Sequence, residues 1–219
     1  FGLNSYARVI KEVPDVVFNT FSYSLAATLL ITLAGGLMSY VIVRRESKWA
    51  GFLDAVLMVP YVVPGVVMAI GFLLTFNKAP LDLVGTGAII VLILFIRRLP
   101  YGVRATSAVL RQIKPSIEEA AIGLGATPAK AFFAVTVPLM MPGIVAGAMM
   151  SFITAINELS STLLLYTAPT TTMPVKVYSA VLDGEFGIAA ALSTLLLACS
   201  GLCVYVVLRF SQSKEAAFV

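Results

Sequence analysis

The sequence predicts an all-α integral membrane protein, a bundle of transmembrane helices with one long polar loop on its cytoplasmic side. Apolar residues make up 59% of the 219 residues and charged residues only 12%, with a mean hydropathy of +0.97. Soluble domains carry about a quarter charged residues. Several apolar runs are long enough to cross a bilayer as helices. Most of the charged residues lie between these runs.

The predicted spans follow from the length of the apolar runs. Four runs can each cross the hydrocarbon core: residues 21–43, 55–76, 135–156 and 187–208. A fifth run, residues 83–96, is shorter, and it spans only if Arg97 and Arg98 extend their side chains to the membrane interface. We therefore expect a bundle of five visible transmembrane helices.

The positions of lysine and arginine predict the orientation, because cytoplasmic loops are enriched in these residues. Four of the fifteen fall on one side of the predicted membrane: Arg8, Lys11, Lys78 and Lys176. The other eleven fall on the opposite side, which is therefore cytoplasmic: Arg44, Arg45, Lys48, Arg97, Arg98, Arg104, Arg111, Lys114, Lys130, Arg209 and Lys214. This topology places Phe1 outside, so we expect a truncated unit with six spans when complete.

Prolines and glycines interrupt two of the spans. Pro60 and Pro64 remove backbone donors from the run 55–76, which is either a kinked packing helix or a mobile wall of a translocation path. Gly143 and Gly147 form a small-xxx-small face that allows close helix contact.

The cytoplasmic loop, residues 97–136, reads as two short helices. Ser116 and Glu119 fit a capping box, with Pro115 just outside the helix. Gly125 stands where a left-handed residue ends the helix. Thr127 then fits the N-cap of a second helix.

The second helix has Pro128 at its first position, and Pro138 and Pro142 mark the start of the following span. The surface of this loop is rich in very small residues, namely Ala120, Ala121, Gly123, Gly125 and Ala126. A helical hairpin lying on lipid headgroups is one interpretation. Small residues favour the other, a docking site for a cytoplasmic protein.

The spacing of these residues resembles the EAA loop of binding-protein-dependent ABC importer permeases. That pattern is Glu-Ala-Ala, three residues, Gly, nine residues, and a hydrophobic pair before proline. The matching positions are Glu119, Ala120, Ala121, Gly125, Val135, Val137 and Pro138, with valine in place of isoleucine and leucine at 135 and 137.

The resemblance implies one ABC importer transmembrane domain over residues 1–219, in a bacterial inner membrane. Its loop would be a coupling helix seated on an ATPase subunit. Implied partners are two ABC ATPases, a second permease half or copy, a periplasmic binding protein and lipid. Residues expected in ATPase docking are Ser116, Glu118, Glu119, Ala120, Ala121, Gly125, Thr127 and Pro138. Glu119 can also cap its helix, so Glu118 is the freer carboxylate for a contact with the ATPase.

The chain itself offers no enzyme chemistry. It has no histidine, the commonest catalytic base and metal ligand. It also lacks the Gly-x-x-x-x-Gly-Lys-Ser/Thr loop that cradles nucleotide phosphates. We expect no enzyme activity, no bound metal or cofactor and no nucleic acid partner, with ATP and Mg²⁺ bound by the ATPase.

Asn157 and Glu158 follow the span 135–156 directly. A carboxylate at membrane depth usually faces a cavity or a partner. Glu158 therefore either lines the translocation path, together with Asn157, Pro60 and Pro64, or lies at the outer interface and caps the segment after it.

The segment "NELSSTLLLY", a threonine-rich turn and "PVKVYSAV" resemble permeases of the ferric iron group most. Thiamine, polyamine, phosphonate, and sulfate or molybdate permeases are alternatives. Many iron-type permeases fuse two homologous halves, and this chain would suit the second half. Two other classes remain open, an ion-gradient-driven secondary transporter and a non-transporting membrane scaffold.

Overall fold

A computed structural model describes the backbone of residues 4–44 and 48–215, and the side chains as far as Val206. Almost all of these residues are helical, which confirms the all-α class. The helices are α1 (Asn4–Glu12), α2 (Pro14–Arg44), α3 (Lys48–Val62), α4 (Gly65–Thr75), α5 (Gly87–Leu110), α6 (Pro115–Gly123), α7 (Pro128–Ala131), the π-helix η1 (Phe132–Thr136), α8 (Val137–Ile156), α9 (Thr162–Leu165), the 3-10 helix η2 (Ala168–Thr170), α10 (Met173–Leu182) and α11 (Phe186–Glu215). Two short antiparallel strands, β1 (Asn77–Lys78) and β2 (Leu81–Asp82), precede α5.

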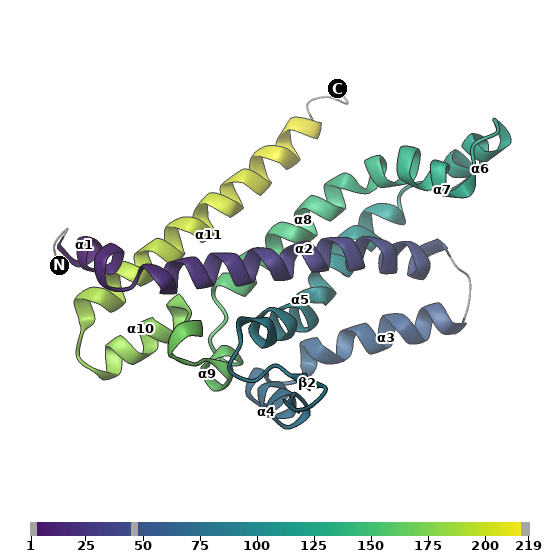
Figure 1. Ribbon diagram of the computed structural model, residues 1–219. Coiled ribbons are helices and arrows are strands. Elements are labelled where there is room, and N and C mark those ends of the chain that lie inside the picture. The colour runs from purple at the N-terminus through teal and green to yellow at the C-terminus, as the bar shows by residue number, and fades with distance from the viewer. Residues whose placement is uncertain (1–3, 45–47, 216–219) are drawn as a thin grey trace.

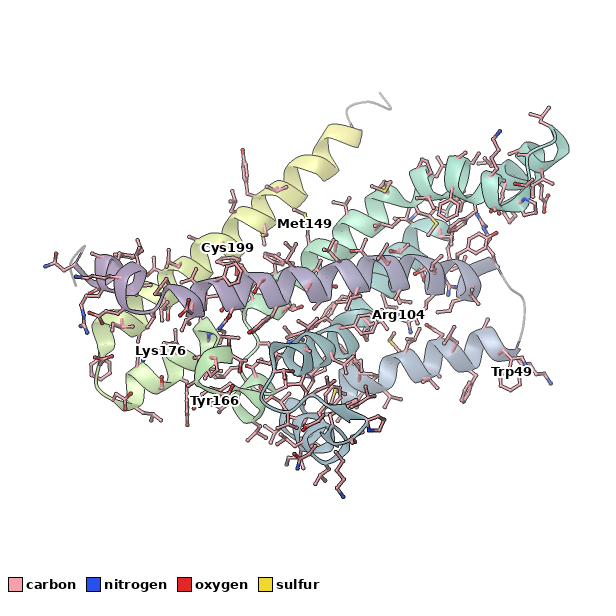
Figure 2. All side chains as sticks on the ribbon, viewed as in Figure 1. Trp49, Arg104, Met149, Tyr166, Lys176 and Cys199 are labelled. Atoms are coloured by element: carbon pink, nitrogen blue, oxygen red, sulfur yellow. The ribbon has the colours of Figure 1, made fainter. Side chains whose placement is uncertain are left out.

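The centre of the molecule is the packing of α2, α5 and α8 (Figure 1). The α6–α7 segment projects from one end of this bundle, whereas α1 and α10 lie at the other end. Figure 2 shows Trp49 and Lys176 toward these two opposite ends. The arrangement agrees with the predicted topology, in which the loop 97–136 and Lys176 lie on different sides. Arg45 is outside the described residues, as are the side chains of Arg209 and Lys214.

Glycines allow α5 and α8 to approach closely. A Cβ atom on Gly147 would lie 2.9 Å from the Cα atom of Gly102, and one on Gly143 would lie 2.8 Å from the carbonyl oxygen of Ala105. Contacts this short leave no space for a side chain. The predicted close-contact face of Gly143 and Gly147 is therefore confirmed, with α5 as its partner.

Three described helices are long and apolar enough to cross a membrane: Pro14–Arg44, Pro128–Ile156 and Phe186–Val206. The bent pair α3 and α4 raises this number to four if it is one span. The predicted fifth span, residues 83–96, is the least accurate. Its helix, α5, begins at Gly87 and continues to Leu110, and it carries three arginines within its length.

The predicted span 55–76 is broken rather than kinked. Helices α3 and α4 meet at an angle of 104°. Pro60 lies inside α3, and Pro64 is the N-cap of α4 with ψ of 139°. A proline disfavours helical backbone in the residue before it, so the break falls at Val63 and Pro64. This break places the start of α4 against α9 and α5.

Candidate functional site

The helix α6 begins earlier than the sequence predicted. Its N-cap is Lys114, and Pro115 is the first helical residue, not a residue outside the helix. No side-chain hydrogen bond caps this end, so the predicted capping box of Ser116 and Glu119 is wrong. The proline explains the difference, because its fixed φ suits the first helical position and its missing N–H costs nothing there. Ser116 is an exposed residue of the first turn.

The end of α6 confirms the prediction for Gly125. This residue has a φ of +95°. Its N–H donates to the carbonyl oxygen of Ile122 at 2.9 Å, and the N–H of Ala126 donates to that of Ala121 at 3.1 Å. This pair of bonds is a Schellman motif, which satisfies the last carbonyls of the helix and needs a left-handed residue.

Thr127 begins the next helix as predicted. Its Oγ1 accepts the N–H of Lys130 at 3.3 Å, and Pro128 is the first residue of α7. The helix then continues through η1 into α8 as one unit, Pro128–Ile156, so Pro138 and Pro142 do not separate it from the span. The N–H of Val137 bonds to the carbonyl oxygen of Phe132, a wide π-helical turn just before Pro138.

The surface of the α6–α7 hairpin, residues 115–131, is mostly exposed. Its exposed residues include Glu119, Ala120, Gly123, Gly125 and Thr127, while Ala121 is half-buried. The predicted surface of small residues is therefore present, but it is not purely small, because Leu124 is 92% exposed at its tip. An exposed apolar side chain beside glycines and alanines suits contact with another protein.

The two adjacent carboxylates of α6, Glu118 and Glu119, point in directions opposite to those predicted. Glu118 is half-buried and accepts hydrogen bonds from the Tyr40 hydroxyl at 2.5 Å and from Thr136 Oγ1 at 2.9 Å. Glu119 is exposed. The interpretation of Glu118 as the freer carboxylate is wrong, since its side chain turns toward α2 and η1. Glu119 is the one that faces outward.

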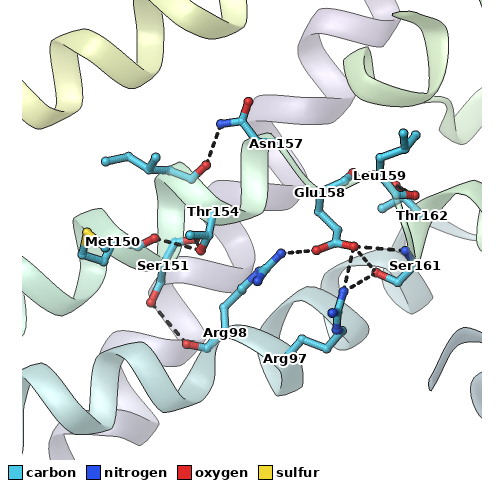
Figure 3. A network of polar contacts seen from close by, with 11 residues as sticks. Arg97, Arg98, Met150, Ser151, Thr154, Asn157, Glu158, Leu159, Ser161 and Thr162 are labelled. Carbon is cyan, nitrogen blue, oxygen red and sulfur yellow. Dashed lines mark hydrogen bonds and ion pairs between the residues drawn. The ribbon is translucent and has the colours of Figure 1, made fainter. Parts of the chain in front are cut away.

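A second group of polar residues lies inside the bundle (Figure 3). The Glu158 side chain is 4% exposed, and it forms ion pairs with Arg97, at 2.7 Å, and with Arg98. The N–H and hydroxyl of Ser161 also donate to Glu158, each at 3.0 Å. We call Arg97, Arg98, Glu158 and Ser161 the ion-pair cluster. One carboxylate thus holds two guanidinium groups and the start of α9.

The arginines of the cluster lie in the middle of α5, not at its end. Helix α5 has 24 residues, so it is about 36 Å long and Arg97 lies about 15 Å from its start. The helix therefore does not end at these arginines, as the predicted fifth span assumed, and the position of Arg97 and Arg98 relative to the membrane interface stays a prediction. Their side chains are 13% and 15% exposed and turn to Glu158. Desolvation explains this pairing, because a guanidinium that is largely removed from water needs an opposite charge.

The all-helical bundle with its projecting hairpin agrees with the family that the sequence matches. The family model described as "Binding-protein-dependent transport system inner membrane component" matches residues 20–214. The chain belongs to this family. This match confirms the resemblance to the binding-protein-dependent permeases, and the chain is an inner membrane component of a transport system of this kind.

Two relatives and one solved structure show the range of similarity. The ferric transport system permease FbpB of Actinobacillus pleuropneumoniae is 32% identical over 201 residues, which cover 89% of this permease and 29% of FbpB. The putative 2-aminoethylphosphonate permease PhnV of Salmonella paratyphi A is 28% identical over 199 residues, which cover 90% of this permease and 75% of PhnV. A chain of the inward-facing MetNI methionine ABC transporter has a TM-score of 0.73 at 17% identity. The match covers 97% of this permease and 99% of the MetNI chain.

The permease therefore spans less than a third of the length of FbpB, with which it shares the higher identity of these two relatives. The MetNI similarity extends over nearly the whole of both chains and establishes the permease fold. At this level of identity it carries no information on the solute.

The other residues predicted along the path are only partly brought together. A Cβ on Gly65, next to Pro64, would lie 2.6 Å from Arg97 Nη1, so the break in the α3–α4 pair adjoins the ion-pair cluster. Pro60 is a turn away in α3. Asn157 points elsewhere and donates to Ser200 Oγ on α11 at 3.0 Å.

Glu158 also lines a small cavity on the side of α2 and α10. Its volume of about 10 Å³ is enough for about one water molecule, and its lining residues include Thr20, Tyr23 and Thr172. The hydroxyl of Thr172 is buried there without a hydrogen-bond partner among the described residues. Of the two sequence interpretations of Glu158, the second expected it to cap the following segment from the outer interface. Glu158 does accept the N–H of Ser161, the N-cap of α9, but its side chain is buried rather than exposed at a surface. Path lining remains a prediction.

The partners of Glu158 are not predicted by the sequence. Arg97 and Arg98 were assigned to the cytoplasmic interface because they end an apolar run. The signal that identifies them is their position inside a longer helix, where adjacent arginines require a carboxylate or a cavity. Among the described residues, no three acidic or cysteine side chains gather to hold a metal ion.

Proposed function

We propose that the permease forms one half of the translocation path of an ATP-driven importer for ferric iron. The relative with the higher identity, at 32%, is a ferric transport permease, against 28% for the phosphonate permease. Thiamine, polyamine, phosphonate, and sulfate or molybdate are the alternative solutes. A second permease half or a second copy completes the path, and a periplasmic binding protein delivers the solute.

The energy comes from two ABC ATPase subunits that bind ATP and Mg²⁺ and dock on the α6–α7 hairpin. The observation that carries this proposal is the exposed α6–α7 hairpin at one end of the bundle, whose first helix ends in a defined turn at Gly125. Glu119, Leu124 and Gly125 lie at its surface. The permease contributes neither catalysis nor a cofactor. It contributes a helical bundle with two packed conformations, and ATP binding and hydrolysis in the ATPase subunits switch the bundle between them.

The ion-pair cluster is the part of the bundle that we assign to the path. It combines charge buried inside the bundle with the break between α3 and α4. Buried charges in membrane segments typically mark solute pathways or gates. The segment from Thr167 to Phe186 at the other end of the molecule, which includes η2 and α10, is the surface proposed for the binding protein.

Replacing Gly125 with valine tests the docking surface. A β-branched residue resists a φ of +95°, at a cost of about 1–2 kcal/mol or more, so the turn between α6 and α7 opens. We expect the ATPase to co-purify with the permease at a level reduced about tenfold. Gly184→Val is the matched control, because Gly184 also has a positive φ of +77° but lies at the opposite end. Equal ATPase recovery with both variants would contradict docking at the hairpin.

A deletion strain tests the solute. We expect loss of radiolabelled ferric iron uptake and its restoration by the intact gene, with thiamine, polyamine, phosphonate and sulfate uptake unchanged. If the intact gene restores the uptake of a different solute, that solute, and not ferric iron, is the one transported. Uptake that persists in ATP-depleted vesicles with an ion gradient would favour the secondary transporter, and unchanged uptake of every solute would favour the scaffold.

A further inference from the structure

We propose that Glu118 is the positioning residue that connects the α6–α7 hairpin to the membrane bundle, so that a displacement of α6 moves α2 and α8. The inference rests on the proposed docking of an ATPase at the hairpin. It assigns a different task to each of two neighbouring carboxylates. Glu119 faces the docked protein, and Glu118 faces the permease itself.

The first argument is the set of contacts of the Glu118 carboxylate. One oxygen accepts from the hydroxyl of Tyr40, four residues before the end of α2, at 2.5 Å. The other accepts from Thr136 Oγ1, at 2.9 Å, and Thr136 is the last residue of η1 and is buried. Hydrogen bonds to an ionised acceptor are stronger than neutral ones. A single side chain of α6 therefore joins two other elements.

Helix capping alone does not explain this geometry. A carboxylate in the first turn of α6 already interacts favourably with the positive end of the helix while it stays in water. Glu118 instead reaches inward to two hydroxyls that are 78 and 18 residues away in sequence. Its orientation connects elements rather than stabilising its own helix.

A second set of contacts strengthens the connection to α2. Arg44 Nη1 donates to the carbonyl oxygen of Ile113, just before α6, at 3.0 Å. The ring of Tyr40 packs edge-on against that of Phe132, with centroids 4.7 Å apart. The end of α2 thus contacts the segment before α6, α6 itself and η1.

Both connected elements transmit motion into the bundle. Thr136 belongs to the continuous helix Pro128–Ile156, so its displacement is shared by all of α8. Ser39, next to Tyr40, donates to the carbonyl oxygen of Val103 on α5 at 3.0 Å. The π-helical turn at η1 lies at this junction, and such turns are common at functional sites. Motion of α6 is therefore passed through Glu118 to the three central helices.

The test uses the complete permease with its ATPase and binding protein, reconstituted in liposomes. The variant Glu118→Gln keeps the size of the side chain but removes its charge. We expect normal co-purification of the ATPase and normal basal ATP hydrolysis, with stimulation of hydrolysis by the binding protein reduced about tenfold. Glu12→Gln is the matched control, because Glu12 is an exposed carboxylate of α1, at the other end of the molecule and outside the surface proposed for the binding protein, and it should keep the stimulation.

Variants of the two partners decide whether Glu118 acts through them. Tyr40→Phe and Thr136→Val each remove one donor and should each lower the stimulation, whereas Thr194→Val, which removes a hydroxyl from α11, should not. Adding Glu118→Gln to the Tyr40→Phe/Thr136→Val variant should cause no further loss. The single-hydroxyl variants also keep the test valid if Glu118→Gln does not fold.

Two results would overturn the inference. Stimulation at the level of the unaltered protein in Glu118→Gln or in the partner variants would show that this connection is not used. Loss of the ATPase from Glu118→Gln would place Glu118 in the docking surface instead. Failure of docking itself is recognised separately, since Gly125→Val would then retain the ATPase.

Discussion

Replacing Glu158 with alanine is expected to lower the free energy of unfolding of the permease by about 3–5 kcal/mol. The substitution leaves the guanidinium groups of Arg97 and Arg98 buried without their carboxylate. It also removes the acceptor of the Ser161 N–H at the start of α9. Thermal unfolding in detergent, followed by size-exclusion chromatography, should show a lower midpoint and less folded protein.

A carboxylate at the surface provides the comparison for Glu158. Glu185 pairs with Arg8 at 3.5 Å, and both side chains are largely in water. Exposed pairs of this kind contribute little, so Glu185→Ala should change stability by less than about 0.5 kcal/mol. Equal stability of the Glu158→Ala and Glu185→Ala proteins would contradict the burial of an essential ion pair at Glu158.

A variant without charge separates folding from transport. Replacing Arg97, Arg98 and Glu158 together by methionine removes the whole ion pair, and such exchanges are often neutral for stability. We expect this variant to regain the unfolding midpoint of the unaltered protein but not its uptake. Recovery of uptake would show that the cluster serves only the fold and would remove it from the path.

Replacing Gly147 with alanine is expected to destabilise the permease by about 1–3 kcal/mol. The added Cβ would lie 2.9 Å from the Cα of Gly102 and 3.2 Å from its carbonyl oxygen. Backbone atoms cannot move aside as a flexible side chain can, so α5 and α8 must separate. The unfolding midpoint and the yield of monodisperse protein measure the effect.

Gly36 on α2 is the matched control for Gly147. A Cβ there meets nothing within 4 Å, and alanine favours a helix over glycine by about 1 kcal/mol. Gly36→Ala should therefore leave the unfolding midpoint unchanged or raise it. If both alanine variants behave alike, close approach of α5 and α8 is not a requirement of the fold.

The two ends of the α6–α7 hairpin show what local sequence can predict. Gly125 and Thr127 were assigned correctly, because a positive φ and an N-cap are set by a few neighbouring residues. The start of α6 was assigned incorrectly, although its signal is also local. Ser116 fits a capping box, but Pro115 occupies the first helical position and moves the start to Lys114.

The polar contacts between distant segments were not predictable in the same way. Glu118 and Glu119 are adjacent and chemically identical, and only the position of Tyr40 and Thr136 decides which one turns inward. Arg97 and Glu158 are 61 residues apart. An apolar run that ends in two arginines is typical of a membrane boundary, and the sequence alone offers no reason to continue the helix past them.

The sequence by itself determined the helical membrane class, most of the long apolar segments, the EAA loop and the turn at Gly125. These properties depend on hydropathy, on motif spacing and on backbone preferences within a few residues. The tertiary structure alone decided the pairing of Arg97 and Arg98 with Glu158, the inward turn of Glu118 and the placement of the α3–α4 break beside the cluster. The physical reason is that a buried charge is satisfied by whichever group the packed helices place within hydrogen-bond distance, and that distance depends on the whole bundle.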